Sequence, residues 1–86
     1  MRVNLSSHFR SYTALAPTVE ARGSTLGEVL LDLDRQFPGL RFRLIDEQDR
    51  VRRHVKVFVN LDVVEELATP VHAADEVHLL GALSGG

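Results

Sequence analysis

The feature that most limits how this chain can fold is one amphipathic segment, residues 25–37. Apolar side chains recur there at the spacing of a single helix face, and they are Leu26, Val29, Leu30, Leu33 and Phe37. The segment begins with Thr25-Leu26-Gly27-Glu28, a capping box in which the threonine oxygen accepts a backbone N–H and the glutamate reaches back. Phe37-Pro38-Gly39 ends it. We predict a helix whose one apolar face must pack against another layer, and we interpret that face as core.

Short alternating segments before this helix predict two strands. Residues 2–6 place Val3 and Leu5 on one face, and residues 18–22 alternate in the same way. Residues 7–17 contain a proline and several polar residues, so they are expected to be a loop or turn. The two strands are therefore expected to form a hairpin.

More strands follow the helix. Residues 54–60 place three valines on one face and Phe58 on the other, where an exposed aromatic is a candidate contact unless a loop covers it. Residues 76–80 predict the last strand, and Val63-Val64 a short edge strand. The charged residues 40–54 are interpreted as a long connection or a short, frayed helix.

The order strand, strand, helix, strand, short strand, strand predicts an α+β domain of two layers. One main helix packs on a mixed sheet of four or five strands, and residues 1–86 are expected to form this single domain. The last strand must lie inside the sheet if its apolar face is to be buried. That placement directs residues 81–86 out beyond the edge of the sheet.

Composition excludes several functional classes. The chain is 44% hydrophobic and 26% charged, with no run near the ~20 apolar residues of a membrane span. Its net charge of −2 creates no general attraction for nucleic acid. With no cysteine, it has no disulfide scaffold, cysteine-ligated metal or thiol nucleophile. The start of the sequence does not resemble a secretory signal, so we expect a cytoplasmic protein with neither membrane nor nucleic acid as partner.

The signatures of an enzyme are also missing. Gly23-Ser24-Thr25 lacks the spacing and lysine of a phosphate-binding loop. His54 and His78 lie on adjacent predicted strands and could approach one another, but two histidines without a carboxylate make a poor metal site, so no metal is expected. Six basic side chains between Arg41 and Lys56 outnumber three acids. This segment is interpreted as a solvated loop, with docking to an acidic partner as the alternative.

The remaining candidate for chemistry is the segment Gly81-Ala82-Leu83-Ser84-Gly85-Gly86. Glycine lacks a Cβ, so a backbone ending in Gly85-Gly86 can approach another surface closely. Six residues from Gly81 extend at most roughly 20 Å, which is enough to enter the active site of another protein. The alternative is an inert, frayed terminus.

Four motifs carry a resemblance to a known family: residues 24–29, 57–60, 75–77 and 79–86, which read STLGEV, VFVN, DEV and LLGALSGG. With them, nearly the whole chain resembles the ubiquitin-like β-grasp sulfur carriers of the ThiS/MoaD group, and most nearly those that supply sulfur for cysteine synthesis. That family often has proline where Gly81 stands and valine-alanine where Leu83-Ser84 stand. Both departures are mild, because Leu83 keeps an apolar anchor and Gly81 loosens the exit of the tail.

The resemblance implies a mechanism centred on Gly86. An E1-like enzyme uses ATP to convert the Gly86 carboxylate into an acyl-adenylate, and sulfur from a persulfide or sulfide donor displaces AMP to leave a thiocarboxylate. A sulfur-accepting synthase then consumes this group. The protein itself binds no cofactor and catalyses nothing. Two sets of site residues follow: those that give the tail access to the partner are Gly81, Leu83, Ser84 and Gly85, and those expected to form the docking patch are Phe58, His78 and Leu80.

Three other functions stay open at this point. The first is the small subunit of a molybdopterin synthase, which uses the same chemistry inside a stable complex. The second is a ubiquitin-like modifier that joins target lysines through isopeptide bonds. The third is a non-covalent interaction domain whose Gly-Gly pair is inert. A stable partner, covalent adducts, or indifference to loss of Gly85-Gly86 distinguishes them.

Overall fold

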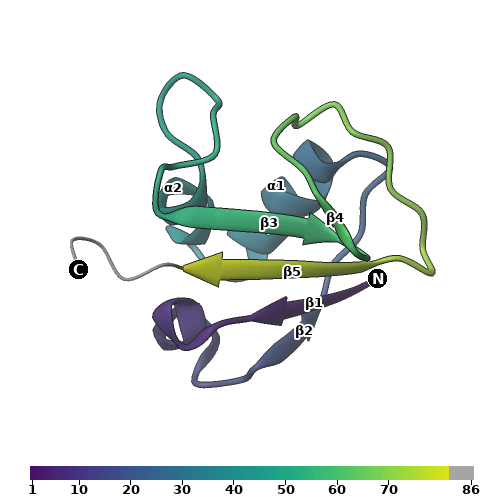
Figure 1. The fold of residues 1–86 in the computed structure, drawn as a ribbon. Helices are drawn as coiled ribbons and strands as arrows, with labels where there is room; N and C mark the ends of the chain where they lie inside the picture. Colours follow the sequence, from purple (N-terminus) through teal and green to yellow (C-terminus); the bar gives the residue numbers. More distant parts are fainter. Residues whose placement is uncertain (82–86) are drawn as a thin grey trace.

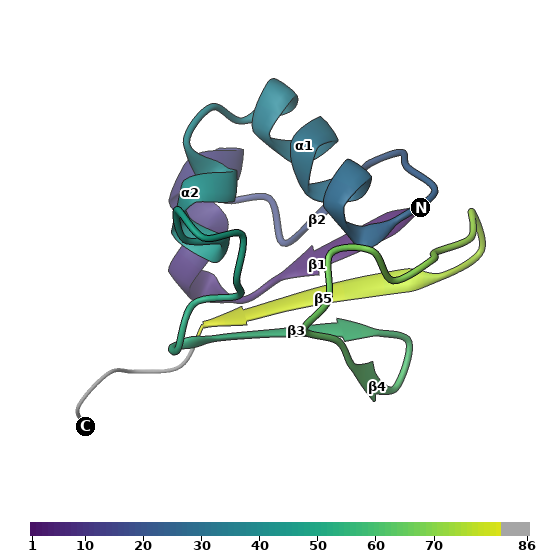
Figure 2. The same cartoon turned by 90° about the horizontal axis from the view of Figure 1, so that it is seen from above.

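The computed structural model describes residues 1–81, which form a five-stranded mixed sheet with all helices on one face (Figure 1, Figure 2). The strands are β1 (Arg2–Leu5), β2 (Thr18–Glu20), β3 (Val55–Val59), β4 (Asp62–Val63) and β5 (Glu76–Gly81). The helices are the 3-10 helix η1 (Ser7–Thr13) and the α-helices α1 (Leu26–Gln36) and α2 (Leu40–Leu44). The two layers predicted from the sequence are confirmed.

The last strand, β5, occupies the centre of the sheet, as predicted. The strand order is β2-β1-β5-β3-β4, with β5 parallel to β1 and antiparallel to β3. The register sets Leu79 between Leu5 of β1 and Val57 of β3, and all three side chains are buried. This sheet, with α1 packed across it, is the β-grasp arrangement that the resemblance implies.

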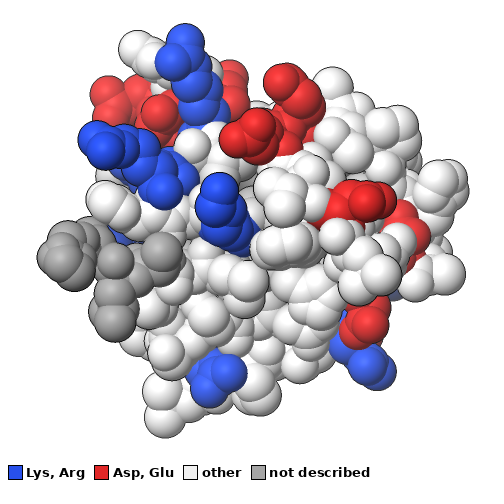
Figure 3. Space-filling view, viewed as in Figure 1, with Lys and Arg blue, Asp and Glu red and all other residues white. Residues whose placement is uncertain are grey.

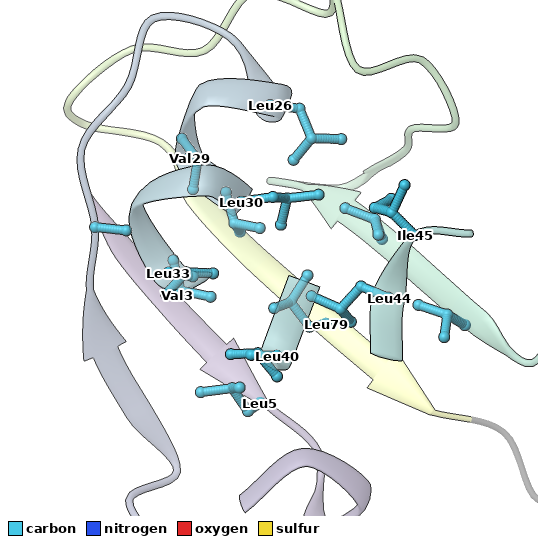
Figure 4. Close-up of a cluster of buried hydrophobic side chains, with 14 of the residues drawn as sticks. Val3, Leu5, Leu26, Val29, Leu30, Leu33, Leu40, Leu44, Ile45 and Leu79 are labelled. Atoms are coloured by element: carbon cyan, nitrogen blue, oxygen red, sulfur yellow. The ribbon is translucent and has the colours of Figure 1, made fainter. Parts of the chain in front are cut away.

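Helix α1 begins with the capping box read from the sequence. The Thr25 Oγ1 accepts the backbone N–H of Glu28 at 3.2 Å, and the Glu28 carboxylate accepts the backbone N–H of Ser24 at 2.7 Å. Leu26, Val29, Leu30 and Leu33 are fully buried, whereas Phe37 is partly buried after the helix ends at Gln36. Figure 4 shows this face of α1 packed against side chains from β1, β5 and α2. The apolar stripe is therefore core, as interpreted.

Residues 7–17 differ from the expected loop or turn, because residues 7–13 form the 3-10 helix η1. Phe9 and Thr13 are its buried side chains, and they are four residues apart along the chain. The Thr13 hydroxyl donates to the carbonyls of Arg10 and Ala16, at 3.2 and 2.8 Å. One apolar anchor among polar residues leaves no periodic pattern, which is why the sequence reading missed this helix.

The connections after α1 follow the predictions with small shifts. The short helix α2 occupies residues 40–44, and Gly39 before it has a φ of +95°, a conformation that favours glycine. The edge strand β4 covers residues 62–63, one residue earlier than predicted. Within residues 1–81, no helix is long and apolar enough to cross a membrane.

Candidate functional site

The candidate site is the end of β5, from which the sequence continues into residues 82–86. Gly81 is the last residue of β5 and pairs with Val55 of β3. On its other side, the Gly81 N–H donates to the Ser6 hydroxyl at 2.9 Å. The remaining predicted tail residues, Leu83, Ser84, Gly85 and Gly86, lie outside the described residues.

The predicted docking residues do lie together, on the sheet face opposite the helices. Phe58 pairs with His78 across β3 and β5, and Leu80 stands on the same face two residues further along β5. Phe58 and His78 are half-buried, and Leu80 is 41% exposed. Phe58 is therefore neither fully exposed nor fully covered by a loop, the two alternatives left open by the sequence. Val63 of β4 pairs with Phe58 and is 53% exposed. We call Phe58, Val63, His78 and Leu80 the outer-face patch.

Val63 was missed as a member of this patch. The sequence indicated an edge strand there but gave no register between that strand and β3. Only the pairing of Val63 with Phe58 shows that the two side chains share a face. A two-residue strand carries too few positions for alternation to set its register.

The β1 side of the outer face is polar. The Asn4 amide nitrogen lies 3.3 Å from His78 Nδ1 and donates to the Glu76 carboxylate at 3.4 Å. Arg2 lies 3.7 Å from the same Glu76 carboxylate. Figure 3 shows charged side chains mostly around the border of this face, and few across its middle. The face therefore has apolar side chains at Phe58, Val63 and Leu80, with Lys56 across from Leu80, beside a hydrogen-bonded part over β1.

The two histidines considered for metal binding, His54 and His78, could approach one another on adjacent strands, but the pairing of β3 with β5 keeps them apart. His54 precedes Val55, which pairs with Gly81, whereas His78 pairs with Phe58 further along β3. Strand direction therefore separates them along the ladder. Among residues 1–81, no group of three or more histidine, aspartate or glutamate side chains is arranged to hold a metal ion.

Two of the three acids in the basic segment 41–56, Asp46 and Asp49, are engaged within it. The pKa of Asp46 is lowered because its carboxylate accepts the backbone N–H groups of Arg50 and Gln48. Asp49 lies 3.3 Å from the Arg41 guanidinium. Arg52 stacks over Phe42 at 4.6 Å and donates to the Phe42 carbonyl. These contacts order the loop between α2 and β3.

A groove of about 230 Å³ lies between this loop and the hairpin of β3 and β4. Valines line it together with the cations Arg52, Arg53 and Lys56 and the acid Glu65. It is next to the end of β5, because Lys56 pairs with Leu80. Docking of an acidic partner here stays a prediction.

The sheet holds the end of β5 in place beside the outer-face patch. The central strand is held by a partner strand on each side along most of its length, and it leads outward at the end where the outer-face patch reaches Leu80. A partner that covers the patch is thereby brought next to Gly81.

Comparison with known proteins agrees with this geometry. The CysO sulfur carrier protein of Mycobacterium bovis is 34% identical over 89 residues, covering 98% of this chain and 96% of the relative. A chain in the crystal structure of the Amycolatopsis orientalis BexX/CysO complex has a TM-score of 0.90 at 30% identity, over 99% of this chain and 98% of that one. The crystal structure of SAMP1 from Haloferax volcanii has a TM-score of 0.78 at 25% identity, over 99% of this chain and 97% of that one.

These neighbours share the ubiquitin-like β-grasp fold, which is therefore the fold of this chain. The model of one protein family also matches the sequence, over residues 7–86, a range that includes β5 and the tail. Together with the CysO relatives, this match shows that the chain belongs to the ThiS family.

Proposed function

We propose that this protein is a sulfur carrier whose reactive group is the carboxylate of Gly86. The observation that carries the proposal is the ThiS family match, which continues through residue 86, together with CysO relatives named as sulfur carrier proteins. The fold supports it, because the tail follows directly from the central strand of the sheet. Cysteine synthesis is the proposed destination of the sulfur, in line with the CysO relatives.

The chemistry follows from the weakness of a carboxylate as an electrophile. In the first step, the Gly86 carboxylate attacks the α-phosphorus of ATP and pyrophosphate leaves, which gives an acyl-adenylate. In the second step, hydrosulfide attacks the acyl carbon and AMP leaves, which gives the thiocarboxylate. A persulfide donor requires one more step, in which a thiol cleaves the acyl disulfide. The chain has no cysteine, so its own side chains offer no alternative thiol for sulfur.

Two partner proteins are proposed, an E1-like adenylating enzyme and a sulfur-accepting synthase. Both would contact the outer-face patch while the tail enters their active sites. The crystal structure of a BexX/CysO complex supports this, because a close structural neighbour of this chain is found there bound to another protein. ATP belongs to the activating partner in this account.

The experiment that tests the function adds one alanine after Gly86. Incubated with ATP, sulfide and a candidate E1-like enzyme, the natural chain is expected to form the acyl-adenylate and then the thiocarboxylate. The extended chain is expected to form neither, because its carboxylate is displaced by one residue, about 3.5 Å. Its thermal unfolding midpoint is expected to be unchanged. Adenylation of the extended chain at the natural rate would refute an end-on mechanism.

A second candidate function is protein modification. The similarity to SAMP1, whose name is small archaeal modifier protein 1, favours it. In that case the activated Gly86 is passed to a lysine amine, and higher-mass covalent adducts accumulate on denaturing gels. We propose sulfur transfer first, because the CysO relatives are more similar in sequence, at 34% against 25% identity.

A further inference from the structure

The end of β5 is held by a residue that lies beyond the end of its neighbouring strand. Strand β1 ends at Leu5, yet the next residue, Ser6, continues the pairing with β5. The Ser6 N–H donates to the Leu79 carbonyl at 2.9 Å, and the Ser6 hydroxyl accepts the Gly81 N–H at 2.9 Å in a partly buried position. The side chain thus takes the place of a backbone acceptor and extends the ladder to Gly81.

This use of Ser6 is unusual for its position. Ser6 is the N-cap of η1, and a serine there ordinarily accepts an N–H from the first turn of its own helix. Its side chain makes no capping hydrogen bond with η1. The hydroxyl is engaged with Gly81 of β5, 75 residues away in sequence. The local helix therefore forgoes its cap while the end of β5 gains an anchor.

His8, in the first turn of η1, covers Gly81 from the helix side of the sheet. A Cβ added to Gly81 would lie 2.8 Å from both Cβ and Cγ of His8. Gly81 is not among the glycines of positive φ, so its backbone conformation does not require glycine. It is the close approach of His8 that requires glycine at this position. Gly81 is thus enclosed by Ser6, His8 and, on the β3 side, Val55.

We propose that Ser6 and His8 are positioning residues that hold Gly81 at the end of β5 and so set the point from which the reactive terminus reaches a partner. This role rests on the proposed sulfur-carrier function. A tether of fixed length and direction raises the effective concentration of the terminus in the partner's active site once the folded body has docked. Release of Gly81 lengthens the tether and widens the directions that it samples. Docking itself is left intact.

The first test uses Ser6→Ala, with Ser6→Thr as the variant that keeps the hydroxyl. Amide hydrogen exchange at Gly81 is expected to accelerate in Ser6→Ala and to stay slow in Ser6→Thr. In adenylation by an E1-like enzyme that accepts the natural chain, kcat is expected to fall about three- to tenfold in Ser6→Ala. KM is expected to stay the same, and Ser6→Thr to recover kcat. A residue with a merely structural role would change the unfolding midpoint without this division between kcat and KM.

The second test examines the contact between His8 and Gly81 by exchanging which residue carries the Cβ. Gly81→Ala alone is expected to lower kcat, because its methyl group collides with His8. The double variant His8→Gly, Gly81→Ala removes the His8 side-chain atoms that the methyl group meets, and it is expected to regain kcat relative to Gly81→Ala. His8→Gly alone serves as the control for the effect on η1.

The outcomes separate this proposal from the proposed function. If the natural chain is adenylated but Ser6→Ala keeps its kcat and its slow exchange at Gly81, the positioning role is wrong and the carrier function stands. If the double variant has no higher kcat than Gly81→Ala, His8 does not position Gly81. If no activating enzyme adenylates the natural chain, the carrier function fails and the positioning role fails with it. The exchange data still report whether Ser6 anchors Gly81.

Discussion

At the scale of single residues, Asn60 shows how one side chain ties a turn to the start of the central strand. Asn60 follows β3 with a φ of +55°, in the left-handed region that asparagine tolerates better than most residues. Its N–H donates to the Glu76 carbonyl at 2.7 Å, and its amide oxygen accepts the Glu76 N–H at 3.0 Å. The amide nitrogen donates to Asp75 at 3.0 Å. Asn60 therefore joins the end of β3 to the start of β5.

Substitution of Asn60 separates its backbone role from its hydrogen bonds. Asn60→Ala loses the side-chain hydrogen bonds and is strained at a positive φ. We expect its free energy of unfolding to fall by about 1–3 kcal/mol. Asn60→Gly keeps the positive φ without strain and is expected to lose less. Urea denaturation of the three proteins measures the order. Equal losses in the two variants would show that the positive φ contributes nothing to stability.

Local sequence can signal a turn at Asn60 but cannot show which residues Asn60 binds. Asparagine after a strand is a common turn signal. The residues it binds lie 15 and 16 positions later, and only the pairing of β3 with β5 brings them close. Ser6 and His8 escaped notice for the same reason, because Gly81 is distant in sequence from both. Local patterns predict local structure, and these contacts are set by topology.

At the scale of elements, the sequence predicts an element most accurately where its apolar periodicity and the residues that begin and end it agree. For α1, the periodicity, the capping box and the terminating proline all lie within 14 consecutive residues, 25–38. For η1 no such agreement exists, because a short 3-10 helix needs only one or two buried side chains. Whether residues 40–54 form a loop or a helix was settled by α2, whose buried Leu40 and Leu44 are one turn apart.

The junction between the turn after β3 and the start of β5 is also expected to make the stability of the protein depend on pH. The pKa of Asp75 is lowered because its carboxylate accepts hydrogen bonds from the Asn60 amide and from the backbone N–H of His72. A lowered pKa means that the stabilisation is present above the ordinary value of 3.8 and is lost as the pH falls through the folded-state value. Asp75→Asn should therefore be less stable than the natural protein at neutral pH.

This difference between the natural protein and Asp75→Asn is expected to narrow as the pH falls below 3.8. Urea midpoints at a series of pH values measure it. Asp62→Asn, which removes an exposed carboxylate from β4, is the charge-matched reference. A difference that stays constant from neutral pH to below 3.8 would contradict a role for the ionised Asp75 carboxylate.

At the scale of the whole molecule, the two faces of the sheet differ in what they contact. One face packs against the helices and holds β5 at the centre, and the other carries the outer-face patch beside the end of β5. The sequence predicted this division, because alternation in residues 54–60 and 76–80 assigns Phe58, His78 and Leu80 to the second face. It could not predict Val63 or the groove at Lys56, since both depend on how β4 and the loop before β3 pack.

Paired leucine variants test whether the outer-face patch docks the activating enzyme. Leu80 is 41% exposed in the patch, and Leu31 is 57% exposed on α1, on the opposite side of the sheet. We expect Leu80→Asp to raise the KM of adenylation about tenfold or more, because a charge would be buried in the interface. Leu31→Asp is expected to leave KM unchanged. Equal KM values for the two variants would place the docking surface elsewhere.

The central claim is that sulfur is carried on the terminal carboxyl group of Gly86. Intact-mass measurement of the protein purified from its native host, followed by fragmentation from the C-terminus, tests it most directly. The account predicts a species in which one oxygen is replaced by sulfur, with the change confined to Gly86, and its loss on incubation with an alkylating agent that yields the thioester. Sulfur found on any other residue, or a Gly86 that stays an ordinary carboxylate when the activating enzyme, ATP and sulfide are all supplied, would contradict the account.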